Sequence, residues 1–161
     1  ALTDFGSLTT CLANQERVLR LIFKDEEVLI KEAKASGQTD INKAFTAFSI
    51  YSDDRRREDL DGSEILRNLS LITEVVGGQP NWARLTQGYI DAYLNPFHGT
   101  KIYEAVSGEI ARRAGAVFRD LKGNDIKMGD YLEKLRTEEN FRLKFIAAGN
   151  EELYKKIRAL I

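Results

Sequence analysis

The side chain best suited to acid–base chemistry near neutral pH in this 161-residue chain is its only histidine, His98. It lies in the segment Asn95-Pro96-Phe97-His98-Gly99, which we expect to be a loop between two helices, where functional residues often lie. A catalytic histidine also needs a carboxylate or a nucleophile beside it, and the sequence cannot supply that geometry. His98 is therefore a candidate binding residue, and an exposed or helix-capping histidine is the alternative.

Metal binding through histidine or cysteine clusters is not expected, because the chain holds one of each, His98 and Cys11. The loops around Gly62 and Gly129 lack the spaced carboxylates of a calcium-binding loop. The sequence also contains no phosphate loop, no dinucleotide fingerprint and no nucleophile elbow. We expect no metal and no cofactor, and the interpretation leans away from an enzyme without excluding one.

Aromatic residues form the second candidate group. Trp82, Tyr89 and Tyr93 recur at helical spacing, and Phe97 follows them closely. Such a stripe is usually part of a core, but Trp and Tyr are also enriched at binding hot spots. With His98, these side chains would form either an exposed contact patch or the wall of a small apolar pocket.

The charge distribution argues against nucleic acid and anionic membranes as partners. The chain has 24 basic and 25 acidic residues, and the two signs are interleaved rather than gathered on a basic face. The densest run, Asp53 to Asp61, is interpreted as a solvated helix face or turn, with a peptide or phosphate cradle of Arg55, Arg56 and Arg57 as the alternative. No apolar run is long enough for a transmembrane segment, so we expect a soluble protein, either cytoplasmic or secreted.

The spacing of apolar residues predicts helices along almost the whole chain. The expected helices cover about 8–36, 40–53, 63–76, 80–94, 100–121, 131–135, 138–147 and 151–160, separated by glycines and by Asn95-Pro96. Hydrophobic residues make up 43% and charged residues 30%, which is typical of a globular protein. The sequence therefore predicts an all-α fold, a single compact bundle of about six to eight amphipathic helices forming one domain over residues 1–161.

Part of the second half resembles abalone sperm lysin and its relatives. The resemblance covers about residues 81–140 and is carried, with several small gaps, by Trp82-Ala83, Tyr103, Glu109-Ile110, Arg112-Arg113, Phe118, Asp120-Leu121-Lys122, Met128 and Tyr131-Leu132. It implies a secreted, non-enzymatic helical bundle that binds an egg-coat glycoprotein or acts on membranes, with Arg112 and Arg113 on a basic exposed track. The chain departs from that family in its balanced charge, and its first half does not align with it.

These observations predict a protein without a reaction of its own, which acts through its surface as a partner-binding or structural module or by self-association. Its candidate contact residues are Trp82, Tyr89, Tyr93, Phe97, His98, Arg112 and Arg113. One alternative is a helical carrier or enzyme that holds a small apolar ligand between helices. The other is the lysin-like secreted protein.

Overall fold

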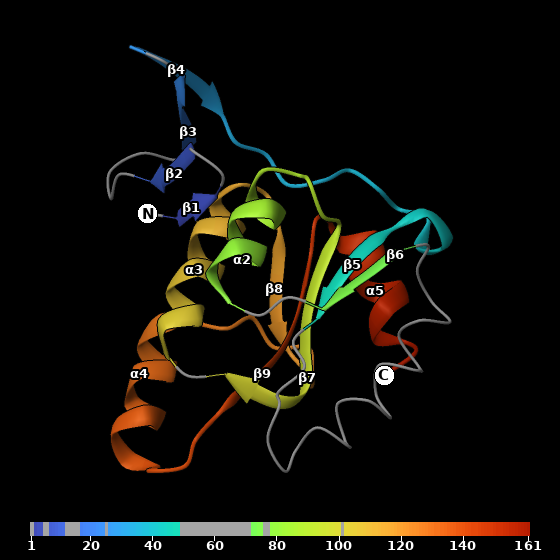
Figure 1. Ribbon diagram of the computed structural model, residues 1–161. Helices are drawn as coiled ribbons and strands as arrows, with labels where there is room; N and C mark the ends of the chain where they lie inside the picture. The colour runs from blue at the N-terminus through green and yellow to red at the C-terminus, as the bar shows by residue number, and fades with distance from the viewer. Residues whose placement is uncertain are drawn as a thin grey trace.

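The protein has a mixed α/β fold with two sheets, seen in a computed structural model that describes residues 2–4, 7–11, 17–24, 26–48, 72–75, 78–100 and 102–161 (Figure 1). The first sheet is antiparallel and has the order β1-β2-β3-β4. Its strands are β1 (Leu2–Asp4), β2 (Ser7–Cys11), β3 (Val18–Lys24) and β4 (Glu27–Glu32). The second sheet has the order β6-β5-β7-β9-β8. Its strands are β5 (Phe45–Phe48), β6 (Ile72–Val75), β7 (Ala92–Thr100), β8 (Val117–Asp120) and β9 (Leu143–Ala148).

Four α-helices and a short 3-10 turn accompany these strands in the described part of the chain. They are η1 (Ile41–Lys43), α2 (Gln79–Thr86), α3 (Ile102–Arg113), α4 (Met128–Thr137) and α5 (Glu151–Arg158). No helix within the described ranges is long and apolar enough to span a membrane.

The prediction of an all-α helical bundle was therefore wrong. The expected helix over 8–36 is replaced by β2, β3 and β4, the one over 40–53 contains β5, and the one over 138–147 overlaps β9. The physical reason is clearest for Phe45–Phe48, which pairs with parallel neighbours on both sides. A strand buried on both faces is a continuous apolar run, and its periodicity does not distinguish it from a short buried helix. The charged run Asp53–Asp61, with Arg55, Arg56 and Arg57, lies outside the described residues.

The directions of the strands in the second sheet bring four of their carboxyl ends to one edge. Strand β5 is parallel to both β6 and β7, whereas β9 is antiparallel to both β7 and β8. Strand β8 therefore runs in the same direction as β7. Strands β5, β6, β7 and β8 end together at what we call the carboxyl edge.

Helices cover both faces of this second sheet: α2, α3 and α4 lie on one side and α5 on the other (Figure 1). Alternate residues of β9 point to opposite faces of the sheet. Phe145 packs into the core beneath α2 and α3, and Ile146 packs into the core beneath α5. In the first core, Trp82 of α2 lies edge-on to Tyr93 and Phe118, with ring centroids 5.1 Å apart in both pairs. The helices that begin or end near the carboxyl edge are thus held firmly against the sheet.

The segment between the two sheets is fixed by polar contacts at the opposite end of the second sheet. The carboxylate of Asp91 accepts hydrogen bonds from the backbone N–H of Phe45 at 2.6 Å and from the Ser36 hydroxyl. The side chain of Asn150 donates to the carbonyls of Ser36 and Gln38, while its oxygen caps α5 by accepting from the N–H of Leu153 at 3.0 Å. These contacts link the connection to β5, β7 and α5.

The β3–β4 hairpin extends away from the helices (Figure 1) and leaves large apolar side chains exposed. Phe23 pairs with Val28, and Leu21 pairs with Ile30, so these four side chains lie on one face of the hairpin. Val28 and Ile30 are 51% and 64% exposed, which marks this face as uncovered by the described part of the chain.

Candidate functional site

The carboxyl edge of the second sheet is the place where polar and helix-terminal groups converge. Helix α2 begins shortly after β6, and α3 begins directly after β7, so both helices start from this edge. In open α/β sheets, ligands bind outside the carboxyl ends of the strands. The first turn of a helix also offers unpaired backbone N–H groups that favour anions. A ligand site is therefore expected at the end of β7 and around it.

The last residues of β7 form a tight, well-defined bend. Gly99 has φ +71°, and its N–H donates to the side-chain oxygen of Asn95 at 2.9 Å. A Cβ atom at this glycine would lie 2.9 Å from the carbonyl oxygen of Leu143 on β9, so no other residue fits there without movement. The hydroxyl of Tyr131 on α4 donates to the Thr100 carbonyl at 3.3 Å. Strand β7 thus reaches α3 along a path set by β9 and α4.

Two buried polar groups at this bend lack a partner among the residues that the structure describes. Asn95 is 2% exposed and Thr100 is 1% exposed, yet Asn95 Nδ2 and Thr100 Oγ1 make no hydrogen bond there. Most buried polar groups in proteins are paired, and an unpaired one costs about 1–3 kcal/mol. At the end of β7, beside the start of α3, unpaired donors are suited to an oxygen-rich anion.

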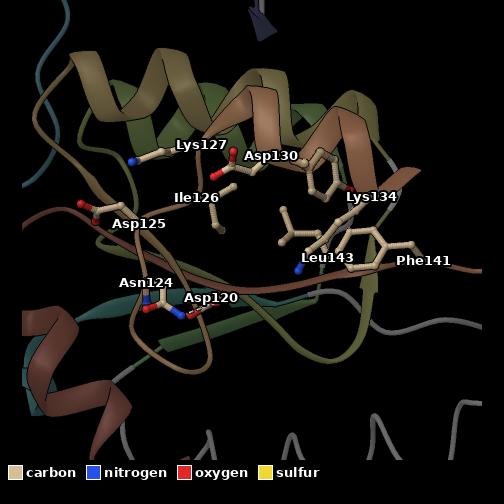
Figure 2. A pocket seen from close by; sticks show the side chains of 10 residues that line it. Asp120, Asn124, Asp125, Ile126, Lys127, Asp130, Lys134, Phe141 and Leu143 are labelled. Carbon is tan, nitrogen blue, oxygen red and sulfur yellow. Dashed lines mark hydrogen bonds between the residues drawn. The ribbon is translucent and has the colours of Figure 1, made fainter. Parts of the chain in front are cut away.

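A pocket of about 370 Å³ lies beside this bend, between α4, the loop after β8 and the start of β9 (Figure 2). Its lining residues are Asp120, Asn124, Asp125, Ile126, Lys127, Asp130, Tyr131, Lys134, Phe141 and Leu143. Tyr131 connects the pocket to the end of β7, because its ring lines the pocket while its hydroxyl binds the Thr100 carbonyl. The pocket and the buried bend are therefore neighbours, joined by Tyr131.

The loop after β8 holds the Asp120 carboxylate in its ionised form. Its oxygens accept hydrogen bonds from the backbone N–H of Asn124 at 2.8 Å and from the Asn124 side chain at 3.0 Å. Burial alone would raise the pKa of Asp120, but these bonds and those from the backbone N–H groups of Lys122 and Gly123 lower it below its ordinary value. The carboxylate therefore remains a hydrogen-bond acceptor at neutral pH.

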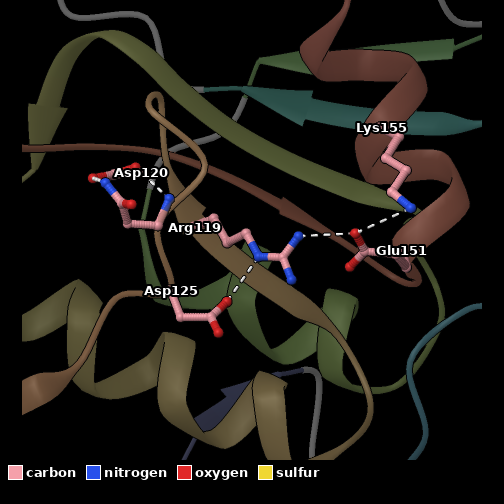
Figure 3. A network of polar contacts seen from close by, with 6 residues as sticks. Arg119, Asp120, Asp125, Glu151 and Lys155 are labelled. Atoms are coloured by element: carbon pink, nitrogen blue, oxygen red, sulfur yellow. Dashed lines mark hydrogen bonds and ion pairs between the residues drawn. The ribbon is translucent and has the colours of Figure 1, made fainter.

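Arg119 of β8 pairs with Asp125 in the loop after β8 and with Glu151 at the start of α5 (Figure 3). Its guanidinium lies 2.7 Å from Asp125 and 2.9 Å from Glu151, and Glu151 is also 3.7 Å from Lys155. The hydrogen bond to Asp125, and to a lesser extent the one to Glu151, raises the pKa of Arg119 above its ordinary value. Arg119 also stacks on the ring of Tyr154, with Cζ 5.0 Å from the centroid. This network fixes the outer side of the loop and neutralises Asp125.

The aromatic residues singled out from the sequence are not gathered into one site. Trp82 and Tyr93 are fully buried in the core, and Phe97 is half-buried against the core beneath α5. Tyr89 is 54% exposed, with its hydroxyl and ring both in contact with Arg20. The stripe is therefore divided between the core and the surface.

The remaining candidates are also dispersed. His98 falls in β7 rather than in a loop between helices, and its side chain lies outside the described part. Arg112 and Arg113 are exposed on the last turn of α3, and both form ion pairs with Glu109. Whether any of the seven residues contacts a partner stays a prediction.

Comparison with solved structures identifies the fold. Sequence comparison finds no matching family model and no similar curated protein. SuhB of Mycobacterium tuberculosis superposes with a TM-score of 0.69 at 16% identity, covering 96% of this chain and 53% of SuhB. An inositol monophosphatase from Zymomonas mobilis gives 0.63 at 18% identity, with 89% and 52% covered. A calcium-bound IMPase family protein from Staphylococcus aureus gives 0.60 at 15% identity, with 89% and 49% covered.

The chain shares the fold of inositol monophosphatase-like proteins and spans about half the length of these structures. This finding overturns the functional prediction of a non-enzymatic helical module. The helical carrier and the lysin-like bundle fail for the same reason, because both assumed an all-α fold. The protein-partner or self-association prediction remains untested.

The calcium-bound neighbour raises the question of a metal site in this chain. Among the residues that the structure describes, no group of three or more His, Cys, Asp and Glu side chains could hold a metal ion. The aspartates of the pocket do not form such a group, and Asp125 is already paired with Arg119. The described residues therefore do not fit a metal centre by themselves.

Proposed function

We propose that this chain is part of a phosphatase that acts on a small phosphate monoester and binds the phosphoryl group at the carboxyl edge. The proposal rests on two buried groups that are unpaired within the described ranges: Thr100 Oγ1, just before α3, and Asn95 Nδ2, at the bend of β7. The shared fold supports it, since neighbours with the same arrangement are named as inositol monophosphatases.

The chemistry that this edge offers is phosphate binding and orientation. A hydroxyl and an amide N–H can donate to phosphate oxygens, and the first turn of α3 adds the positive end of a helix dipole. Donors fixed by a rigid bend need no reorganisation when the charge on the phosphoryl group changes during transfer. Gly99 and its contacts with Asn95 and Leu143 supply that rigidity.

The direct test is release of inorganic phosphate from small monoesters, with inositol monophosphate as the first substrate, measured with and without added Mg²⁺ or Ca²⁺. Calorimetric titration with inorganic phosphate provides a second readout that does not require turnover. Hydrolysis of at least one monoester would support the enzyme assignment. If neither hydrolysis nor phosphate binding is detected, the proposal is wrong.

Thr100→Val tests the role of the Thr100 hydroxyl in phosphate binding, because it removes this unpaired group and preserves the shape of the side chain. We expect phosphate affinity to fall about tenfold, the loss of one hydrogen bond to a charged group. The stability should be unchanged or slightly higher, since the hydroxyl has no partner in the described part of the folded chain. Calorimetry and urea unfolding measure the two effects separately.

Thr86→Val is the matched control. Thr86 is fully buried like Thr100, but its hydroxyl donates to the Trp82 carbonyl at 2.6 Å. Its loss should lower the free energy of unfolding by about 1 kcal/mol and leave phosphate affinity unchanged. Equal effects of the two substitutions on phosphate affinity would contradict the assignment of Thr100.

A further inference from the structure

The pocket beside the carboxyl edge has a chemistry of its own. We infer that it binds an uncharged hydroxylated ring, a monosaccharide or a cyclitol, between α4 and the loop after β8. This site goes beyond the proposed phosphatase function and does not depend on it, because the phosphate site uses Asn95 and Thr100 and this one uses neither.

The inner wall of the pocket is apolar and aromatic. Ile126, Tyr131 and Leu143 are almost fully buried, and the Phe141 ring packs edge-on against Tyr131 with centroids 5.5 Å apart. A pocket of about 370 Å³ is near the lower end of the range for small-molecule sites, so it suits a ligand of one ring. The C–H face of a sugar or cyclitol ring can pack against such aromatic side chains as an apolar surface.

The opposite side of the pocket is polar and offers both acceptors and donors. Asp120 is ionised and held in place by Asn124, as described above. Asp130 in the first turn of α4 has no hydrogen-bond or ion-pair partner among the described residues. The Lys134 ammonium group lies over Phe141, 5.4 Å from its centroid, and Figure 2 shows this side chain crossing toward the hollow. Hydroxyl groups can donate to the carboxylates and accept from the lysine.

The balance of charges favours a neutral ligand. The lining carries three carboxylates and two lysines, and Asp125 is neutralised by Arg119 outside the lining. An anionic ligand would face Asp120 and Asp130, and a simple cation would face Lys134. The aspartates also fail to form a metal-binding group within the described residues. An uncharged ligand with many hydroxyl groups can donate hydrogen bonds to the carboxylates and accept them from the lysines. It therefore leaves no charged group of the pocket without a partner.

The experiment uses glucose and myo-inositol as probes and follows saturation transfer from the protein to the ring protons by NMR. We expect binding in the millimolar range for at least one of them. Phe141→Leu keeps an apolar side chain and should weaken binding about fivefold, because the aromatic face is lost. Asp130→Asn should weaken it about tenfold, because a charged acceptor is replaced by a neutral amide.

Glu133→Gln is the matched control for Asp130→Asn. Glu133 is an exposed carboxylate on the same helix, pairs with Arg136 at 2.8 Å and does not line the pocket. Its substitution should leave sugar binding unchanged. Thermal unfolding confirms that each variant is folded, and Asp130 is exposed, so its replacement should be tolerated.

Two outcomes would overturn the inference. One is the absence of saturation transfer to both probes at tens of millimolar, and the other is an equal loss of binding in Asp130→Asn and Glu133→Gln. Independence from the phosphate site is tested in the same samples. Thr100→Val should retain sugar binding, and inorganic phosphate should not displace the sugar; displacement would show that the two sites are one and would refute a separate pocket.

Discussion

Replacing Trp82 with alanine is expected to lower the free energy of unfolding by about 3–5 kcal/mol. The side chain is fully buried, and its ring contacts Tyr93, Phe118 and Phe145, all at centroid distances of 5.1 Å. The substitution removes the largest apolar side chain of the core and leaves a cavity that rings on three strands cannot fill by small shifts. Edge-on aromatic contacts add to the loss beyond the buried area alone.

Tyr89→Ala is the control for this prediction, because Tyr89 lies in the same aromatic stripe of the sequence. It is 54% exposed and its contacts are with Arg20 at the surface. We expect a cost of about 1 kcal/mol or less. Urea unfolding of both variants measures the difference. A cost below about 2 kcal/mol for Trp82→Ala, or similar costs for both variants, would show that Trp82 is not the centre of the core.

The contrast between Trp82 and Tyr89 also shows that helical spacing in the sequence does not determine which residues belong to one helix. Trp82, Tyr89 and Tyr93 follow helical spacing, but α2 ends at Thr86 and Tyr93 belongs to β7. Trp82 and Tyr93 therefore meet in the core from different elements, whereas Tyr89 lies in the segment that connects α2 to β7 and is exposed. The stop is marked by Gly88, which has φ +72° and follows the C-cap Gln87, and its N–H donates to the Leu85 carbonyl at 3.1 Å. The predicted helix over 80–94 ran through this glycine, although a glycine just after the last helical residues is a helix-ending signal.

Two helix starts were predicted correctly from local signals. Helix α2 begins around Pro80, as expected for proline in a first turn, and α5 begins after Asn150, whose side chain accepts from the Leu153 N–H. These signals are local, since cap and helix are adjacent in the sequence. Such signals do not depend on the rest of the fold.

One strand could have been recognised from its pattern. The run Phe141-Arg142-Leu143-Lys144-Phe145 alternates apolar and charged residues, the period of a strand, and it contains the start of β9. The prediction of a helix over 138–147 gave this alternation too little weight. For β5 no such pattern exists, because the strand lies between β6 and β7 inside a sheet that helices cover on both faces.

The candidate site could not have been predicted in the same way. Asn95 and Thr100 are polar residues in a largely apolar strand, and their position becomes special only because β9 and α4 pack around the end of β7. Asp120, Asn124 and Asp130 likewise reach one pocket through the turn after β8 and the start of α4. These groups come together through non-local packing, which a single sequence does not reveal.

The second large effect is expected at Gly108, inside α3. Alanine in a helix interior is normally favoured over glycine, by about 1 kcal/mol. Here a Cβ atom would lie 2.4 Å from Cε1 and 2.6 Å from Cδ1 of Phe118. That ring is 2% exposed and lies against Trp82 and Phe145, so it has no free space to enter. We therefore expect Gly108→Ala to destabilise the protein by about 1–3 kcal/mol, despite the better helix propensity.

Gly129→Ala gives the opposite expectation within the same chain. Gly129 lies in α4, and a Cβ atom added there would meet nothing within 4 Å, so alanine should stabilise the protein by up to about 1 kcal/mol. Thermal and urea unfolding of the two variants should move in opposite directions. A stabilised Gly108→Ala variant would show that α3 does not pack on β8 as closely as described.

The consequence for function follows from the position of α3. This helix begins at the carboxyl edge beside Thr100, and its close approach to Phe118 sets its distance from the sheet. A Cβ at Gly108 that pushes α3 outward would also move its first turn away from the proposed phosphate site. Gly108→Ala should therefore weaken phosphate binding in the fraction that remains folded, whereas Gly129→Ala should not. Calorimetry below the unfolding transition would separate this displacement of α3 from a simple loss of stability.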